Sequence, residues 1–134
     1  MRKKAIAVII KDDKVLLMRR IKDGRQFFVL PGGGVKIKEN LESAAVRVIR
    51  EEFDLEIKID TFLFRMENQG RTEFYFLVKS FEGEPRISGE IRQIINENNQ
   101  YHLQWKKLNT LDKLSSLRPT EARKKIQRLL SLVG

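Results

Sequence analysis

Short apolar runs separated by charged turns make up most of the hydrophobic pattern of this chain. Alternating apolar and polar positions, rich in branched and aromatic residues, predict strands, and Asp12-Asp13 marks the turn between the first two. The predicted strands cover residues 3–10, 14–20, 26–30, 56–66, 72–79 and 101–108. Pro31 ends the third strand, and Asn68-Gln69-Gly70 predicts a turn after the fourth.

Two segments have apolar positions spaced by three and four residues, which is typical of amphipathic helices. In the first segment, Asn40 is placed to cap a helix that runs to Phe53. Its apolar positions are Leu41, Ala44, Ala45, Val48, Ile49 and Phe53. The second helix begins near Pro119, a favourable residue for a first turn, and is amphipathic. Its apolar face carries Ile126, Leu129 and Leu130.

The order of these elements predicts the fold class. Strands outnumber helices and the two kinds are interleaved, so the pattern predicts an α/β layered sandwich around a mixed β-sheet. Residues 81–99 are polar and predict a long surface loop with room for a short helix. No linker or repeat divides the chain, and 134 residues suit a single domain over 1–134.

Composition narrows the chemistry. The chain has no cysteine and one histidine, which excludes disulfides, cysteine nucleophiles and zinc sites built from several histidines. The net charge of +9 favours a polyanionic partner such as a nucleotide or nucleic acid, although a solvated lysine-rich surface explains it equally well. Since the longest apolar run, over residues 5–10, is too short for a membrane span, we expect a cytoplasmic protein without a membrane partner.

One carboxylate lies within the apolar stripe of the first helix. At about 100° per residue, Glu52 falls within roughly 20–40° of Leu41, Ala45 and Val48. A lone ionised carboxylate facing the core costs several kcal/mol, so Glu52 needs a buried arginine or a divalent cation beside it. Glu51 lies at the edge of the stripe, where an ordinary ion pair with Arg47 is the simpler interpretation.

Three consecutive glycines, Gly32-Gly33-Gly34, follow the third strand. Glycine lets the backbone approach a ligand, so exposed carbonyls there could bind a cation and exposed N–H groups a phosphate. A plain turn is the other interpretation. The triplet is neither a Walker A loop nor a dinucleotide-binding fingerprint, because the residues that those motifs require do not follow.

Taken together, these residues resemble the signature of the Nudix hydrolase family, G-x5-E-x7-R-E-U-x-E-E-x-G-U, in which U is aliphatic. Seven of its nine specified positions match in one register, and they are Gly33, Glu39, Arg47, Ile49, Glu51, Glu52 and Leu55. The resemblance of the elements extends over most of the chain. It implies a Nudix-type α/β/α sandwich and the hydrolysis of a nucleoside diphosphate linked to another group, with Mg²⁺ or Mn²⁺ as cofactor.

The resemblance also implies roles for individual residues. Glu51, Glu52 and the carbonyl of Gly32 would face the metal, and Glu39 and Arg47 would form an internal ion pair. Glu90, in the long loop, is the first candidate for a further metal ligand or general base, with Glu97 second. By position in the family, Arg20 would contact a phosphate or base, alongside the backbone of Gly33 and Gly34.

Two positions depart from the family pattern. Asp54 replaces a glycine that caps the helix in a left-handed turn, a conformation that aspartate tolerates. Val48 replaces a glutamate one turn before Glu52, and valine cannot bind a cation. We therefore expect a weakened metal site and reduced turnover. Either Glu51, Glu52 and a loop carboxylate hold enough metal for slow turnover, or a general base comes from elsewhere.

Several alternatives stay open at this point. The chain could be a Nudix domain that binds a nucleotide or RNA without cleaving it, or an enzyme that processes RNA ends. Tyr101, His102 and Trp105 could stack on a base, although packing within a strand explains them better. Relatives in the family suggest a homodimer.

Overall fold

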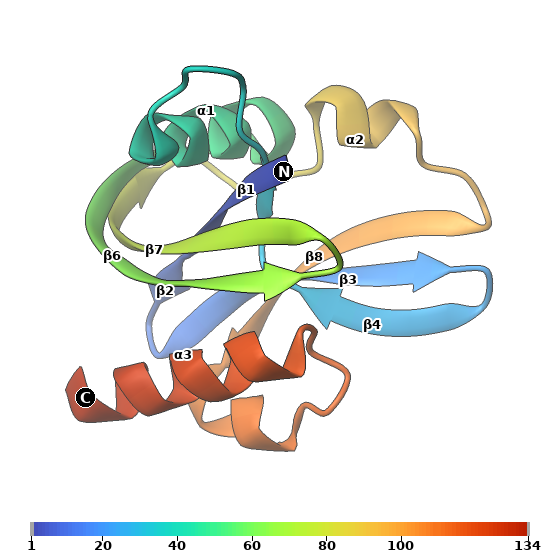
Figure 1. Cartoon of the computed structure of the whole chain (residues 1–134). Helices are drawn as coiled ribbons and strands as arrows, with labels where there is room; N and C mark the ends of the chain where they lie inside the picture. Colours follow the sequence, from blue (N-terminus) through green and yellow to red (C-terminus); the bar gives the residue numbers. More distant parts are fainter. Residues whose placement is uncertain (1, 134) are drawn as a thin grey trace.

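The computed structural model describes residues 2–133 and places two β-sheets between layers of helices (Figure 1). The first sheet contains β1 (Arg2–Val8), β5 (Gly32–Gly34), β6 (Glu56–Asn68) and β7 (Arg71–Glu82). The second contains β2 (Ile10–Lys11), β3 (Lys14–Lys22), β4 (Arg25–Val29) and β8 (Asn99–Lys107). The helices are α1 (Leu41–Phe53), α2 (Gly89–Gln93), the 3₁₀ helix η1 (Leu108–Lys113) and α3 (Thr120–Val133).

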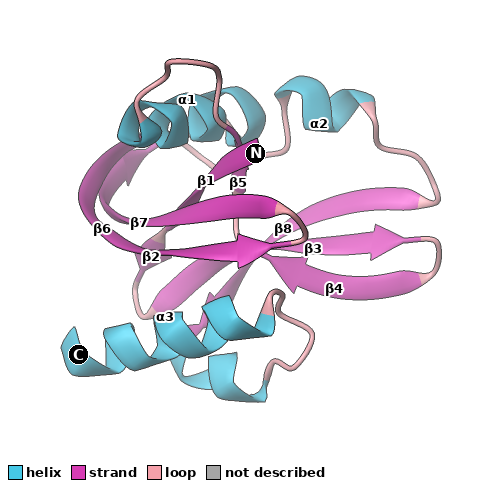
Figure 2. Cartoon of the chain, in the orientation of Figure 1, coloured by secondary structure: helices cyan, strands magenta, loops and turns pink. Residues whose placement is uncertain are grey.

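The first sheet is mixed, as the sequence predicts. Its strand order is β5-β1-β7-β6, with β1 and β7 parallel and the other pairs antiparallel. The second sheet is antiparallel and has β3 at its centre, paired with β2, β4 and β8. In Figure 2 the helices lie above and below these strands, so the predicted α/β class is confirmed.

Helix α1 begins and ends where its sequence predicts. The Oδ1 atom of Asn40 accepts hydrogen bonds from the backbone N–H groups of Glu42 at 2.9 Å and Ser43 at 3.1 Å. These bonds satisfy two of the free donors at the helix N-terminus. At the other end, Asp54 adopts the left-handed conformation, with φ 57°, and its N–H donates to the carbonyl of Ile49. The predicted replacement of a capping glycine by Asp54 is therefore confirmed.

The two faces of the first sheet bury separate apolar clusters. One cluster joins β1, β7 and α3 through Val8, Tyr75 and Ile126, each at most 1% exposed. The other face packs on α1, where Ala45 and Ile49 are fully buried. Burial of each large apolar side chain stabilises the folded state by about 1.5–3 kcal/mol. Together these side chains fix α1 and α3 on opposite faces of the sheet.

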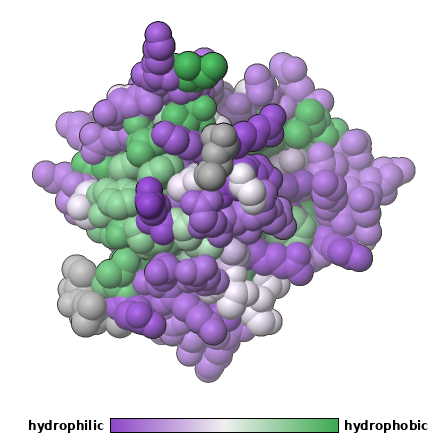
Figure 3. Space-filling view, viewed as in Figure 1, coloured by the Kyte–Doolittle hydropathy of each residue, from purple (hydrophilic) through white to green (hydrophobic). Residues whose placement is uncertain are grey.

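The predicted loop over residues 81–99 contains the short helix α2, which lies beside α1 at the top of Figure 1. On the face drawn in Figure 3, most of the surface is hydrophilic, and apolar surface gathers at the left, over α1 and β6. Among residues 2–133, no helix combines the length and the apolar character that crossing a membrane requires.

Candidate active site

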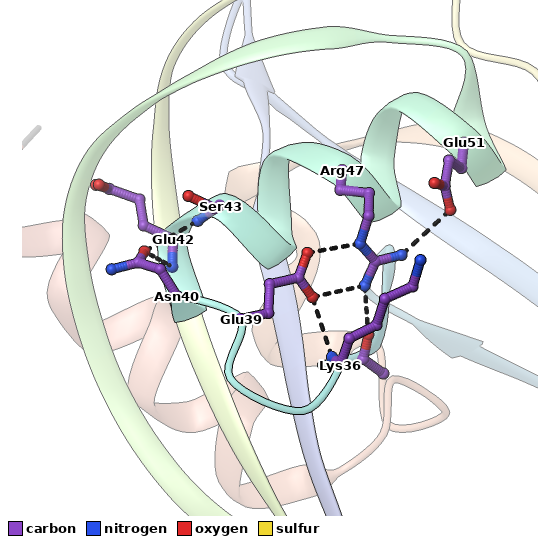
Figure 4. A network of polar contacts seen from close by, with 8 residues as sticks. Lys36, Glu39, Asn40, Glu42, Ser43, Arg47 and Glu51 are labelled. Atoms are coloured by element: carbon purple, nitrogen blue, oxygen red, sulfur yellow. Dashed lines mark hydrogen bonds and ion pairs between the residues drawn. The ribbon is translucent and has the colours of Figure 1, made fainter.

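Arg47, near the middle of α1, holds the glycine-rich segment and the loop after it against the helix (Figure 4). Its Nε donates to Oε2 of Glu39 at 2.7 Å, and its Nη2 donates to Oε1 of Glu39 at 2.9 Å. Nη2 also donates to the carbonyl of Gly34 at 2.9 Å, and Nη1 donates to Oε2 of Glu51 at 3.1 Å. The two bonds between Arg47 and Glu39 form a bidentate ion pair, which is the internal pair that the resemblance implies.

The ion pair shifts the titration of both partners. The hydrogen bonds from Arg47 lower the pKa of Glu39 to about 2, and the backbone N–H of Lys36 adds a bond of 3.0 Å to Oε1. The same contact with Glu39 raises the pKa of Arg47 above its ordinary value. Both groups therefore stay charged at neutral pH, and the loop before α1 stays fastened to the helix.

The glycine triplet forms a strand, β5, rather than a free loop. A Cβ atom at Gly32 would lie 2.6 Å from the carbonyl oxygen of Ala5, so only glycine fits beside β1 there. A Cβ at Gly33 would lie 2.8 Å from a methyl carbon of Val48. Because both glycines let the backbone lie directly on β1 and α1, they fix the position of this segment relative to the carboxylates of the helix.

Glu52 lies between α1 and α2 instead of in the apolar core. Its Oε2 accepts a hydrogen bond of 2.9 Å from the backbone N–H of Ile91, and the side chain is half-buried. Ser88 completes the contact, since its N–H donates to the carbonyl of Glu52 and its hydroxyl to the carbonyl of Glu51, both at 2.8 Å. The carboxylate of Glu52 thus caps a short helix from another part of the chain.

Gly89 makes this docking possible. Its φ of +59° is left-handed, and a Cβ atom there would lie 2.6 Å from the carbonyl oxygen of Glu51 and 3.0 Å from Oε2 of Glu52. The sequence predicted that Gly89 could let the loop fold inward, and the observed geometry agrees with that prediction. Glu90, the next residue, lies exposed in the first turn of α2, and Glu97 lies exposed in the turn before β8.

The acidic residues provide few metal donors. Within residues 2–133, no three aspartate, glutamate, histidine or cysteine side chains gather as a metal-binding group. Glu51 is 48% exposed and shares one oxygen with Arg47, while Val48, at 3% exposed, packs in the apolar core. Magnesium in phosphate-handling sites needs only one or two carboxylates, with water and substrate completing its ligands. Glu51 and Glu52 are the two carboxylates in the last turn of α1, a smaller donor set than the family signature specifies.

A cleft of about 450 Å³ lies next to this helix end, and Gly32 and Ile91 line one side of it. Arg20 enters the cleft from β3 and stacks on Tyr101, with its guanidinium carbon 3.8 Å from the ring centroid. One of its terminal nitrogens donates to Oδ1 of Asn99 at 2.7 Å, and its buried Nε has no hydrogen-bond partner among the described residues. Arg20 is therefore fixed in place by the ring of Tyr101 and the side chain of Asn99.

The floor of the cleft contains a buried acid that the sequence did not single out. Glu73 on β7 is 5% exposed and accepts hydrogen bonds from the hydroxyl of Tyr75 at 2.8 Å and from Nδ2 of Asn68 at 3.2 Å. The same cleft is lined by five positively charged residues, namely Lys4, Arg20, Lys22, Arg71 and Arg118. The alternation along β7 places Glu73 and Tyr75 on one face, but only the pairing of the strands shows which face meets the cleft.

The sequence left open whether the aromatic residues of β8 stack on a base or pack within the protein, and the structure shows one of each kind. Tyr101 lines the cleft beneath Arg20. Trp105 packs against Phe81, with ring centroids 5.9 Å apart, and Nε2 of His102 lies 2.9 Å from Oε1 of Gln100. Packing thus accounts for Trp105, whereas Tyr101 is available to the site.

Comparison with known proteins agrees with this fold. The model of the NUDIX domain family matches residues 1–129. The solution structure of the E. coli ORF135 protein has a TM-score of 0.73 at 21% identity, over 97% of this chain and 89% of that one. A MutT structure from Aliivibrio salmonicida and Vibrio cholerae has a TM-score of 0.71 at 21% identity, over 96% of this chain and 94% of that one. A structure of an ADP compounds hydrolase has a TM-score of 0.74 at 18% identity, covering 99% and 75% of the two chains.

The fold, the glycine segment and the ion-paired helix together define a Nudix domain, and this chain belongs to the Nudix family. A curated relative, the ADP-ribose pyrophosphatase of Methanocaldococcus jannaschii, is 42% identical over 57 residues. That match covers 42% of this chain and 34% of the relative, so the chain aligns with about a third of the relative's length.

Proposed function

We propose that this protein is a pyrophosphohydrolase that cleaves a nucleoside diphosphate linked to another group and depends on Mg²⁺ or Mn²⁺. The observation that carries the proposal is the Nudix helix fastened by Glu39 and Arg47 directly beside a cationic cleft. The names of two similar proteins, an ADP-ribose pyrophosphatase and an ADP compounds hydrolase, support a substrate of this class.

Glu51, Glu52 and the carbonyl of Gly32 would hold the cation at the end of α1. When bound, a divalent ion neutralises charge on the diphosphate and lowers the pKa of a coordinated water. Arg47 orients Glu51 through the bond of 3.1 Å and keeps the glycine segment in place through Gly34. Arg20, fixed on Tyr101, would contact the substrate beyond the diphosphate.

Glu90 is the proposed general base. It lies on α2, which is fastened to the same end of α1 through Ser88 and Glu52. An exposed carboxylate near that end can accept a proton from the attacking water once substrate is bound. Because Val48 supplies no oxygen, we expect turnover below that of a chain with the complete signature.

A second candidate function is a binding module that retains the nucleotide without cleaving it. Two observations favour it: Oε2 of Glu52 already accepts the N–H of Ile91, and Val48 is buried in the core. Binding of nucleic acid and formation of a homodimer stay predictions from charge and family resemblance.

The test is an assay of phosphate or mononucleotide release from ADP-ribose and a panel of nucleotides with Mg²⁺ or Mn²⁺. Glu52→Gln retains an oxygen for the N–H of Ile91 but removes the charge, so α2 stays capped while metal binding weakens. We expect its kcat to fall by about a hundredfold or more, because a weakly held cation no longer activates the water that it coordinates.

Glu84→Gln is the matched control, because Glu84 is an exposed carboxylate outside the motif. It should leave kcat unchanged, while a titration of Mn²⁺ should show weaker binding only in Glu52→Gln. Saturable nucleotide binding without any turnover in the natural chain would favour the binding module. Full activity in Glu52→Gln would contradict the proposed role of this carboxylate.

A further inference from the structure

Three cations from both sheets meet over the floor of the cleft. Lys4 on β1 and Arg71 at the start of β7 come from the first sheet, and Arg20 comes from the second. All three side chains are half-buried and line the same cleft. The structure therefore brings together positive charges that lie far apart in the sequence.

These cations repel one another. Burial lowers the pKa of Lys4, and the charges of Arg71 and Arg20 lower it further, while Glu73 opposes the change. Like charges held close together in a partly buried site lower stability unless an anion neutralises them. Such an arrangement is typical of a binding site for an anion.

The protein itself supplies little neutralising charge. Among residues 2–133, none of the ion pairs within 4.0 Å involves Lys4, Arg20 or Arg71. Among the described residues that line the cleft, Glu73 is the one carboxylate, so a single negative charge faces three positive ones. The buried Nε of Arg20 also has no partner in this part of the chain. The positive charge of the cluster is thus only partly offset within the protein.

The cleaved diphosphate would lie next to the proposed metal site, while the cluster continues to the hairpin between β6 and β7. Gly32 and Ile91 lie on the side of the cleft next to the proposed metal site, whereas Arg71, Asn68 and Glu73 come from the ends of β6 and β7. A cleft of about 450 Å³ holds a group the size of a nucleoside with a phosphate. A neutral nucleoside would leave the three cations unneutralised.

We propose that Lys4, Arg20 and Arg71 bind a second phosphate, a phosphomonoester carried by the part of the substrate that lies away from the scissile diphosphate. The proposal rests on the proposed function and narrows its substrate class to phosphorylated nucleoside diphosphate derivatives. Guanidinium groups suit this role because their N–H donors match the spacing of phosphate oxygens.

Matched substrate pairs test the proposal, because the members of each pair differ by one phosphate. ADP-ribose is compared with ADP-ribose 2′-phosphate, and 3′-dephospho-coenzyme A with coenzyme A. We expect kcat/KM to be about tenfold or more higher for the phosphorylated member of at least one pair, mainly through a lower KM. Arg71→Gln and Lys4→Gln should each reduce that preference by about tenfold, because only the phosphorylated member loses a charge-assisted hydrogen bond.

Lys79→Gln is the matched control, since Lys79 is an exposed cation on the same strand as Arg71. It removes the same charge and should leave the preference unchanged. Lys4→Arg keeps the charge and should also retain the preference for the phosphorylated substrate. Circular dichroism checks that each variant is folded. Equal kcat/KM values within both pairs would overturn the inference, and so would an equal loss of preference in Lys79→Gln.

Binding without metal separates this inference from the proposed function. Calorimetry in excess EDTA should show that adenosine 2′,5′-bisphosphate or adenosine 3′,5′-bisphosphate binds about tenfold more tightly than AMP, and that Arg71→Gln removes the difference. Equal affinities for all three would overturn the second phosphate site even if ADP-ribose is hydrolysed. Tight bisphosphate binding without hydrolysis of any substrate would instead contradict the proposed function and leave the phosphate site standing.

Discussion

At the residue scale, the two departures from the family signature have different consequences. Asp54 takes over the left-handed cap of the missing glycine, with φ 57°, so α1 ends in the same manner. Val48 replaces a charged residue with an apolar one that packs against Gly33 and is 3% exposed. The first change preserves local geometry, while the second removes a possible metal ligand and adds to the core.

The Glu39–Arg47 pair makes stability depend on pH. The pKa of Glu39 is lowered from 4.5 to about 2 in the folded chain, so its contribution is fully present above about pH 4.5 and is lost as pH falls toward 2. We expect Glu39→Gln to lower the free energy of unfolding at pH 7 by about 1–2 kcal/mol. The difference from the natural chain should shrink between pH 4.5 and pH 2, as measured by urea denaturation. A difference that stays constant with pH would contradict the assigned pairing.

Val48→Glu tests what the missing carboxylate does. The variant buries a charge among apolar side chains, so without metal its free energy of unfolding should fall by about 3 kcal/mol. Mn²⁺ should restore part of this loss and raise the rate of hydrolysis above that of the natural chain. Thermal melts with and without Mn²⁺ measure the effect. Val48→Gln, of similar size without charge, is the control, and an equal Mn²⁺ shift in both variants would refute the interpretation.

At the element scale, α2 connects the motif helix with the cleft. Its N-terminus is held by Glu52 and Ser88, while Ile91 both donates to Glu52 and lines the cleft. The contact is short, since α2 spans Gly89–Gln93 and none of its residues is fully buried. A helix of this length depends on its caps and docking for stability.

Gly89→Ala should detach α2 from α1. The added Cβ would lie 2.6 Å from a backbone oxygen in a left-handed conformation, so we expect a loss of about 1–3 kcal/mol in stability and faster hydrogen exchange at the Ile91 amide. Gly24→Ala is the matched control, because Gly24 is also left-handed, with φ +81°, but has nothing within 4 Å of an added Cβ. Exchange at Ile91 that is equally fast in both variants would show that the contact with Glu51 does not fasten α2.

At the scale of the whole molecule, part of the excess positive charge, which is +9 in total, lies along one cleft. Lys4, Arg20, Lys22, Arg71 and Arg118 all line one cleft, and Glu73 is the acid among its lining residues. A charged cleft with apolar walls concentrates its field and raises the rate at which oppositely charged ligands arrive.

We therefore expect kcat/KM for an anionic substrate such as ADP-ribose to fall by about tenfold when NaCl rises from about 0.05 M to about 0.5 M. The physical reason is that salt shortens the range of the field around the cleft. Initial rates at several salt concentrations measure the effect, with sucrose of equal osmolality as the control. A rate that does not change with salt would indicate that the excess charge lies outside the path of the substrate.

The sequence by itself determined the parts of this protein that depend on local geometry. Alternation predicted the strands, and spacing predicted α1 with its cap at Asn40, because these features involve residues close along the chain. The resemblance to the Nudix signature implied the cap at Asp54 and the pairing of Glu39 with Arg47. Only the tertiary structure decided that Glu52 caps α2 and that Lys4, Arg20, Arg71 and Glu73 share one cleft. Glu52 and Ile91 are 39 positions apart, and Lys4, Arg20 and Arg71 lie on three different strands. The packing of two sheets and a loop, which no local pattern encodes, determines which of these residues meet.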